Sequence, residues 1–152
     1  MNPKPIKRKT ELQGVSRDHH HALLLVWKIN KGISNKIEPE RIINYIGWFR
    51  KEHLEPHFTV EEEFMFPVLG NEHPKVQQAL HEHIQLLSQA KNAENYKDLE
   101  NFAKLLKNHI RFEERDLFQL IQEKATQEEL DLIEKKHQDE KFCERTEDEF
   151  WK

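Results

Sequence analysis

Apolar residues recur three and four positions apart along most of the chain, with charged residues between them. This period predicts amphipathic α-helices rather than strands. The first helix is expected to begin at Ser16, a good N-cap residue, and to end within residues 32–35. Its inward-facing stripe consists of Val15, His19, Ala22, Val26, Ile29 and Ile33.

Three further stripes follow, separated by short stretches that contain Gly, Pro or Asn. These residues interrupt helices, so the stripes predict separate helices over about 39–68, 74–90 and 96–123. Pro56 lies inside the second of them. We expect it to remove one backbone hydrogen bond and to bend the helix.

The C-terminal part has a pattern of its own. Thr126 and Glu129 fit a capping box, so a fifth helix is expected to follow them. The end of the chain, from Glu144 to Lys152, is highly charged, and Phe142, Phe150 and Trp151 are the side chains with which this part could dock. We therefore predict an all-α fold, an up-down-up-down four-helix bundle with an extra C-terminal helix. Its parts are a flexible N-terminal arm (1–11), the bundle (12–123) and a C-terminal helix and tail (124–152).

Two segments combine histidine and glutamate in the same order. His57 precedes Glu61 by four residues and His109 precedes Glu113 by four, and in each case a second glutamate and a Phe-containing apolar run follow. Residues four apart lie on the same side of a helix, so each segment can direct one imidazole and one carboxylate toward the same point. In both segments this is the apolar side, where polar groups need a compensating partner.

His19 and His83 complete a layer with one histidine from each of the four helices. In an antiparallel helix pair, residues at the same height are equally far from the connecting turn. The midpoints between consecutive histidines fall at Glu38, Gly70 and Tyr96, which coincide with the predicted breaks. We therefore expect the four histidines to lie at one height in the bundle.

These positions define a candidate metal site. Six protein ligands are too many for a tetrahedral structural zinc, and they suit two octahedral metals that share carboxylates. A metal-free bundle with hydrogen-bonded histidines is the alternative, but these groups cannot easily satisfy one another in apolar surroundings without a cation. The predicted ligands are His19, His57, Glu61, His83, His109 and Glu113.

Composition narrows the function. The 152 residues suffice for one domain with a core. The net charge of -4 gives no basic excess, so we expect binding neither to nucleic acid nor to a membrane surface. The lone Cys143 excludes an internal disulfide and fits a reducing compartment. No segment resembles a signal peptide or reaches transmembrane length, so a cytoplasmic protein is expected.

Three strings resemble those of the hemerythrin-like (HHE cation-binding) domain family, over roughly residues 12–123. They are Ser16-Arg-Asp-His-His-His-Ala-Leu, Glu52-His-Leu-Glu-Pro-His-Phe and His109-Ile-Arg-Phe-Glu-Glu. The resemblance implies a four-helix bundle with a non-haem di-iron centre, in which an oxo or hydroxo bridge links two iron ions. The histidines of the layer would be terminal ligands, and Glu61 and Glu113 the bridges. Zinc and manganese are the alternative metals.

The oxygen-carrying hemerythrins have the pattern His-x-x-x-His on the third helix. Here Leu87 stands four residues after His83. The chain is therefore more similar to the branches with a single histidine at this place, which include iron sensors and di-iron proteins of nitrosative stress.

Several residues near the layer have more than one interpretation. His20 is the alternative to His19, and His53 is a seventh ligand, a hydrogen-bond partner of a ligand or a packed histidine. Glu62 and Glu114 are acceptors for ligands or surface residues, and we expect Glu62 at the surface. The histidines expected to take no part are His73, His81 and His137, and the apolar wall around the centre is expected from Phe49, Phe64, Phe102 and Leu106.

The leading hypothesis is a metal-binding protein that binds or senses O2, a related small ligand such as peroxide or nitric oxide, or iron. The alternatives are a di-iron redox enzyme, acting as a peroxidase or reducing nitric oxide, and a helical interaction module with a structural metal. The sequence contains no nucleophile–base arrangement, phosphate-binding loop or cofactor fingerprint. Their absence from the pattern favours binding or sensing over a separate catalytic reaction.

Overall fold

The computed structural model describes residues 7–137 and 142–152, and these residues form helices and no strands. The all-helical prediction is therefore confirmed. The α-helices are α1 (Gln13–Ser34), α2 (Pro39–Phe49), α3 (Glu55–Val60), α4 (Pro74–Asn92), α5 (Tyr96–Phe112), α6 (Phe118–Lys124) and α7 (Gln127–His137).

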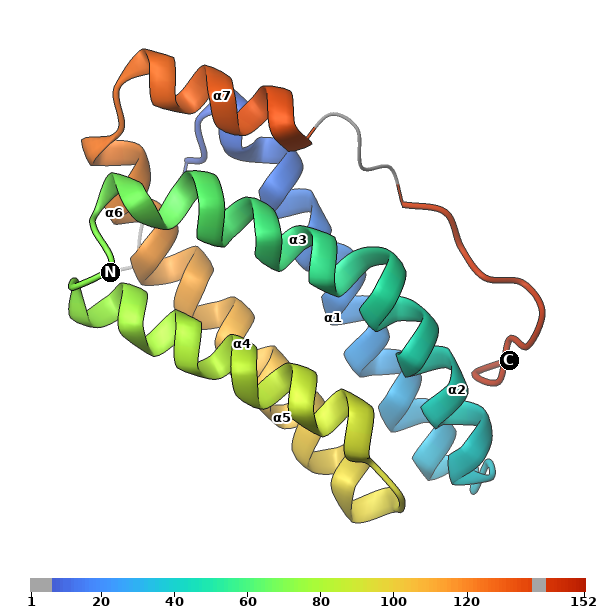
Figure 1. The fold of residues 1–152 in the computed structure, drawn as a ribbon. Coiled ribbons are helices and arrows are strands. Elements are labelled where there is room, and N and C mark those ends of the chain that lie inside the picture. The colour runs from blue at the N-terminus through green and yellow to red at the C-terminus, as the bar shows by residue number, and fades with distance from the viewer. Residues whose placement is uncertain (1–6, 138–141) are drawn as a thin grey trace, which may run out of the picture.

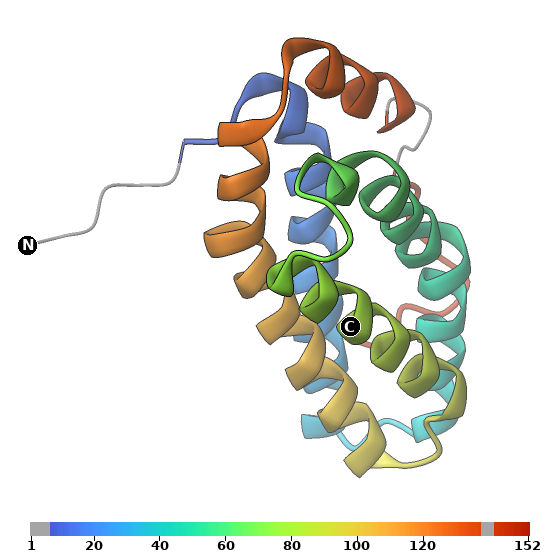
Figure 2. The same ribbon diagram turned by 60° about the vertical axis from the view of Figure 1, so that its left-hand side comes forward.

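Four helical arms lie side by side: α1, α2 continued by α3, α4, and α5 continued by α6 (Figures 1 and 2). Short turns join consecutive arms, so each arm runs opposite to the one before it. Helix α7 crosses one end of the arms, where it lies against the beginning of α1 and against α3. Thr126 and Glu129 exchange hydrogen bonds at its start, as the predicted capping box requires.

The first helix begins earlier than predicted. A 3-10 turn at Thr10–Leu12 leads directly into Gln13, so Ser16 is not an N-cap. Its hydroxyl instead donates a hydrogen bond to Glu114 Oε2 at 3.0 Å. Ser16 therefore ties the first arm to the fourth.

Residues 7–9, expected in a flexible arm, are anchored to α6 by Gln122. The Gln122 amide donates to the carbonyl of Lys7 and accepts from the N–H of Lys9. Arg8 donates to the Glu114 carbonyl. These hydrogen bonds connect residues 7–9 to the fourth arm, and residues 1–6 of the predicted arm lie outside the described residues.

Three π-helical turns continue the α-helices, at Arg50–Leu54, Glu61–Met65 and Glu113–Leu117. In each, an N–H bonds to the carbonyl five residues before it, which widens the turn by one residue. The first precedes Pro56, which has no N–H to donate, and the wider turn lets the helix continue past it. The other two begin at the two glutamates predicted as bridges, and π-turns within helices frequently mark functional sites.

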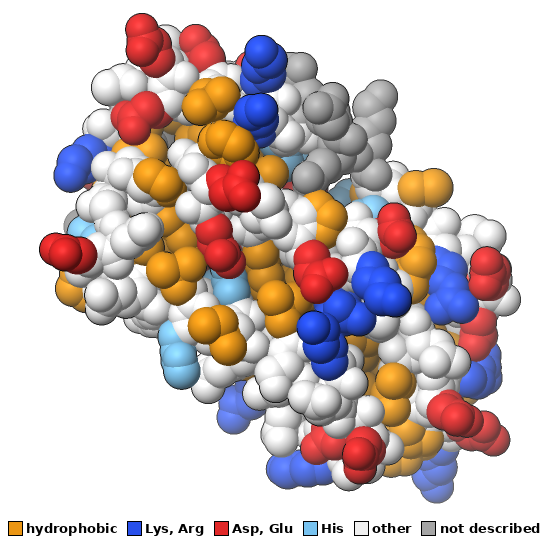
Figure 3. Space-filling model, in the orientation of Figure 1, with side chains coloured by type: hydrophobic (Ala, Val, Ile, Leu, Met, Phe, Trp, Pro, Cys, Tyr) orange, Lys and Arg blue, Asp and Glu red, His pale blue; other side chains and the backbone are white. Residues whose placement is uncertain are grey.

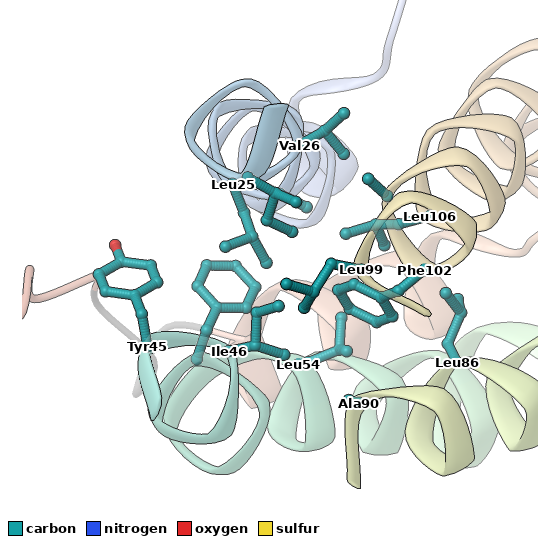
Figure 4. Close-up of a cluster of buried hydrophobic side chains, with 14 of the residues drawn as sticks. Leu25, Val26, Tyr45, Ile46, Leu54, Leu86, Ala90, Leu99, Phe102 and Leu106 are labelled. Carbon is teal, nitrogen blue, oxygen red and sulfur yellow. The ribbon is translucent and has the colours of Figure 1, made fainter. Parts of the chain in front are cut away.

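The buried apolar side chains form two clusters. The larger occupies the half of the molecule shown in Figure 4 and the smaller the half next to α7. Along α1, Val15 belongs to the smaller cluster and Ala22 to the larger, with His19 between them. On α4, Ala79 and Leu86 flank His83 in the same way. The predicted histidine layer therefore divides the apolar core in two.

The C-terminal segment, residues 142–152, docks against α1 and α2. Phe150 is only 1% exposed and packs on Gly32, where a Cβ would lie 2.9 Å from its ring. Lys28 donates to the Tyr45 hydroxyl at 2.9 Å and to Glu144 at 2.6 Å. Arg41 adds an ion pair with Asp148 at the surface. The aromatic end thus docks, as the sequence allowed.

The face shown in Figure 3 carries both acidic and basic side chains, interspersed with apolar ones. This mixture fits the small net charge of -4. Among the described residues, no helix is both long enough and apolar enough to cross a membrane.

Candidate metal centre

The six predicted ligands meet in the polar layer between the two core clusters. Glu61 and Glu113 are 0% exposed, and each of the four histidines is at most 5% exposed. The four arms contribute them in turn, with His19 from α1, His57 and Glu61 from the second arm, His83 from α4, and His109 and Glu113 from the fourth. The structure thus brings together all six side chains, and their binding of a metal stays a prediction.

The imidazole Nε2 atoms and the carboxylate oxygens approach one another closely. Glu61 Oε1 lies 3.3 Å from His57 Nε2, one turn away, and 3.2 Å from His83 Nε2 of another arm. Glu113 Oε1 lies 3.2 Å from His109 Nε2 and 3.0 Å from His19 Nε2. Each glutamate therefore faces one histidine of its own helix and one of a different arm.

These atoms form two overlapping sets of four. The first set is His19, His57, Glu61 and Glu113, and the second is Glu61, His83, His109 and Glu113. Within each set, one potential ligand atom from every residue lies within 4.8 Å of the others. Both glutamates belong to both sets, which is the arrangement that two adjacent cations with shared carboxylates require.

Each histidine also faces a carboxylate through its other ring nitrogen, Nδ1. The distances are 2.8 Å for His19 to Glu114, 2.9 Å for His57 to Asp18, 2.7 Å for His83 to Glu62 and 2.7 Å for His109 to Glu82. A carboxylate accepts hydrogen bonds, so it fixes the proton on Nδ1 and leaves the Nε2 lone pair directed at the centre. Carboxylates orient metal-binding histidines in this way.

The four outer carboxylates form a closed ring around the molecule. In each case the carboxylate comes from the arm that precedes the arm of its histidine. The fourth arm closes the ring, because its carboxylate holds the histidine of the first arm. Each carboxylate is also the sequence neighbour of a central residue: Asp18 precedes His19, Glu62 follows Glu61, Glu82 precedes His83 and Glu114 follows Glu113.

The sequence interpretation found only part of this ring. Two interpretations of Glu114 were open, and the structure shows that it accepts a hydrogen bond from His19. Glu62 lies at the surface, as expected, with its side chain 41% exposed, and it also accepts a hydrogen bond from His83. Asp18 and Glu82 were missed, although their position next to a predicted ligand is the signal that could have found them.

The centre fits a cation. Among the described residues, both oxygens of Glu61, one of Glu113, and the Nε2 atoms of His83 and His109 are buried and have no hydrogen-bond partner. Their mutual approaches are close but lack hydrogen-bond geometry. Buried polar atoms left in this state are costly, and a cation between them would satisfy all five.

The first set gives a second reason. The Nε2 atoms of His19 and His57 are 3.2 Å apart. Each of these atoms also approaches a carboxylate oxygen, at 3.0 Å from Glu113 for His19 and 3.3 Å from Glu61 for His57. Two imidazole nitrogens and two carboxylates directed at one point form a donor set that a cation would hold together.

The electrostatics of the layer also favour a cation. Burial lowers the pKa of His57, but the charge of Glu61 and the hydrogen bond to Asp18 outweigh burial and raise it well above its ordinary value. Burial likewise opposes the Glu113 charge at His109, whose pKa is nevertheless raised to about 9. Without a metal, protons therefore gather on these rings, and a metal cation would replace them.

Aromatic rings cover the histidines. Phe58 stacks on His83, with ring centroids 3.7 Å apart and planes 8° apart. Phe66 lies on another side of His83, at 5.6 Å, and Phe118 stacks on His19 at 5.1 Å. These rings restrict His19 and His83 and shield the faces that they cover from water.

Of the predicted apolar wall, Phe49 and Leu106 line the same pocket as His57 and His109, whereas Phe64 and Phe102 are not part of its lining. Phe64 is partly exposed and lies under the ammonium group of Lys136. Phe102 is fully buried in the larger core cluster. The π-turn that begins at Glu61 adds a residue to the helix, so Phe66 takes the inward place expected for Phe64.

The other histidines take several roles. His20 and His81 are exposed, which leaves His19 as the inward residue of its run. His53 belongs to neither set of potential ligands and packs against Trp48 and Phe142. His73 accepts a hydrogen bond from the Lys75 N–H and so caps α4.

His137, expected to take no part, is connected to the centre. Its Nε2 donates to Asp18 Oδ2 at 2.7 Å, the same oxygen that holds His57. The absence of a side chain at Gly14 makes room for the ring, because a Cβ there would lie 2.7 Å from His137 Nδ1. The sequence carries no local signal for this contact, since it depends on how α7 docks.

A cavity of about 620 Å³ adjoins the layer. His19, His57 and His109 form part of its wall, together with apolar residues of α1, the second arm and α5. Residues 142–147 of the C-terminal segment close it on another side. The cavity therefore joins the candidate metal centre to the part of the chain that follows α7.

The chain is thus an all-helical protein with a candidate cation site of buried, carboxylate-held histidines. The family model described as the hemerythrin HHE cation binding domain matches residues 12–121. The chain therefore belongs to the hemerythrin HHE cation-binding domain family. Searches of curated proteins and of solved structures found no match.

Proposed function

We propose that this protein binds two iron ions in the polar layer. His19 and His57 would hold one ion and His83 and His109 the other, with Glu61 and Glu113 as bridges. The observation that carries the proposal is that both glutamates belong to both sets of potential ligands. We also propose that residues 12–123 form an up-down-up-down four-helix bundle, to which a C-terminal helix is added.

Each ion would receive four protein donor atoms, two from imidazoles and one from each glutamate. Iron accepts octahedral coordination, so positions remain open on both ions. Leu87, which stands where oxygen-carrying hemerythrins have a further histidine, contributes no donor. Because positions on both ions would remain open, we propose that the centre binds or senses O2 or a related small ligand such as peroxide or nitric oxide.

The chain's own residues would prepare the centre for such a ligand. Bound iron would supply redox chemistry and the open positions. The ring of outer carboxylates orients the four imidazoles, and Phe58, Phe66 and Phe118 keep bulk water away from them. A dry, ordered surrounding of this kind controls how a metal reacts.

A redox enzyme built on the same centre is the second candidate, and the cavity beside the layer favours it because an enzyme needs room for a substrate. Rapid mixing of the ferrous protein with O2, peroxide or nitric oxide separates the two functions. A single uptake per centre followed by a stable product supports binding or sensing. Repeated consumption of the added ligand supports an enzyme.

Substitution of the predicted ligands tests the metal centre itself. In His57→Ala or Glu113→Ala, at least one ion should be lost, since either change removes a donor from a buried set. The measurement is the iron content of the purified, reconstituted protein, with the near-ultraviolet absorption of the oxidised form. His81→Ala, an exposed histidine on α4, is the control and should retain all the iron. Equal iron in all three variants would contradict the proposal.

A further inference from the structure

We propose that the cavity beside the metal centre is a binding site for a small, uncharged aromatic molecule with a hydroxyl group, such as a phenol. The inference deepens the proposed function, on which it rests, because a molecule in this cavity would lie against three of the proposed ligand residues. Four features of the cavity support it: the volume, the apolar lining, an unpartnered nitrogen of His53, and the charges at the rim.

The cavity is much larger than a diatomic ligand needs. Its volume is about 620 Å³. A water molecule occupies about 30 Å³ in the liquid, and O2 or nitric oxide needs comparable space. Sites for small organic molecules have volumes of roughly 300–1,000 Å³. The cavity belongs to this second class.

The lining is apolar and aromatic where it is most buried. Its inner wall consists of Ala22, Phe49, Leu54, Phe58, Leu106 and Ile110. Toward the C-terminal segment, Phe142 stacks on His21, with centroids 4.1 Å and planes 3° apart, and lies 4.5 Å from His53. Trp48 completes this group of rings at 5.0 Å from His53. Flat aromatic molecules pack well on such surfaces.

Outside the proposed metal ligands, one described side chain of the lining has a buried polar atom without a hydrogen-bond partner. His53 Nε2 is buried and makes no hydrogen bond to the described residues. Burial lowers the pKa of His53, so the ring is neutral at physiological pH and one nitrogen donates while the other accepts. A hydroxyl group can donate or accept, so it satisfies His53 Nε2 in either tautomer. A phenol offers this group on an aromatic body.

Charge at the rim disfavours an anionic ligand. Among the described residues, Glu52, Glu144 and Glu147 line the cavity together with one guanidinium, that of Arg145. Arg145 also pairs with Glu147 at 3.3 Å, and Glu144 with Lys28 at 2.6 Å. Among the described residues of the lining, an aromatic carboxylate would therefore meet acidic side chains and no unpaired cation. A neutral phenol would not be repelled by these side chains.

The wall supplied by the C-terminal segment is fixed rather than loosely placed. Phe150 anchors it on Gly32, and Glu144 is held by Lys28 and Tyr45. A site with walls held in this way needs little reorganisation when a ligand enters, which favours binding.

The test is calorimetric titration of the iron-loaded protein with phenol and with benzoate, after its iron content has been measured. Phenol should bind saturably, and benzoate at least about tenfold more weakly, because like charges oppose its entry. His53→Leu should weaken phenol binding by roughly three- to tenfold, the worth of one hydrogen bond. Ala22→Phe should abolish binding by filling the cavity. His20→Ala, exposed and outside the lining, is the matched control and should bind as the wild type does.

Two results would overturn the inference: no saturable phenol binding, or phenol binding that neither Ala22→Phe nor His53→Leu changes. These outcomes are separate from failure of the proposed function. If the protein takes up no iron and phenol still binds in a manner that depends on His53, the metal proposal fails and the cavity site stands. If iron is present and phenol does not bind, only the cavity site fails. Circular dichroism of each variant checks that it is folded.

Discussion

Each histidine of the central layer is held by a carboxylate at Nδ1 and directs its Nε2 toward the centre. His83 shows why this matters, because its Nδ1 partner, Glu62, reaches it from the surface of the molecule. A histidine held on one side only can rotate or change tautomer. The outer carboxylate therefore decides whether the lone pair is aimed at a metal before the metal arrives.

Glu62 and Glu63 make a matched pair for testing this role. Both are exposed glutamates in the same helical turn, but only Glu62 hydrogen-bonds a central histidine, and Glu63 makes no side-chain hydrogen bond within the described part of the chain. Glu62→Ala should weaken the affinity for iron by about 10–100-fold, the usual effect of removing such a partner. The measurement is competition with a chelator of known affinity. Glu63→Ala should change the affinity less than about twofold, and an equal effect of the two substitutions would contradict the role of Glu62.

Helix α7 is connected to the centre at the level of elements. His137 holds Asp18, and Asp18 holds His57, so a helix outside the matched domain residues contributes to the position of a central histidine. This contact exists because Gly14 leaves space on α1. Glycine within a helix costs about 0.5–1 kcal/mol relative to alanine, so its presence here has a packing reason.

The contact between Gly14 and His137 predicts that the effect of Gly14→Ala on stability changes sign when the His137 side chain is removed. In the wild type, Gly14→Ala should lower the free energy of unfolding, because the new Cβ would lie 2.7 Å from His137 Nδ1 and displace the ring from Asp18. In a His137→Ala background, the same substitution should raise stability by about 0.5–1 kcal/mol through helix propensity. Urea unfolding of the four proteins measures both effects. The same sign and size in both backgrounds would show that the contact is unimportant.

Much of this arrangement could be predicted from the sequence. Four histidines equidistant from the turns, two of them followed by glutamate one helical turn later, sufficed to predict which side chains meet. Local patterns could not predict what depends on neighbouring arms. Asp18 and Glu82 act on histidines of other helices, and the place of Phe66 depends on a π-turn that no propensity signals. The contact of His137 depends on the docking of α7.

At the scale of the whole molecule, a buried polar layer separates two apolar clusters. The layer is expensive without a cation, because its unpartnered oxygens and nitrogens lie where water cannot reach them. A bound metal would join the two halves of the core and stabilise the native state by its binding free energy. Metal binding and folding should therefore be measured together.

Anaerobic titration of the metal-free protein with Fe(II), followed by calorimetry and by the melting temperature, tests this claim most directly. The two overlapping ligand sets predict saturation at two ions per chain, with a rise in melting temperature that continues to the second equivalent. Saturation at one ion, or a melting temperature that Fe(II) does not raise, would contradict the account of a paired metal centre bridged by Glu61 and Glu113.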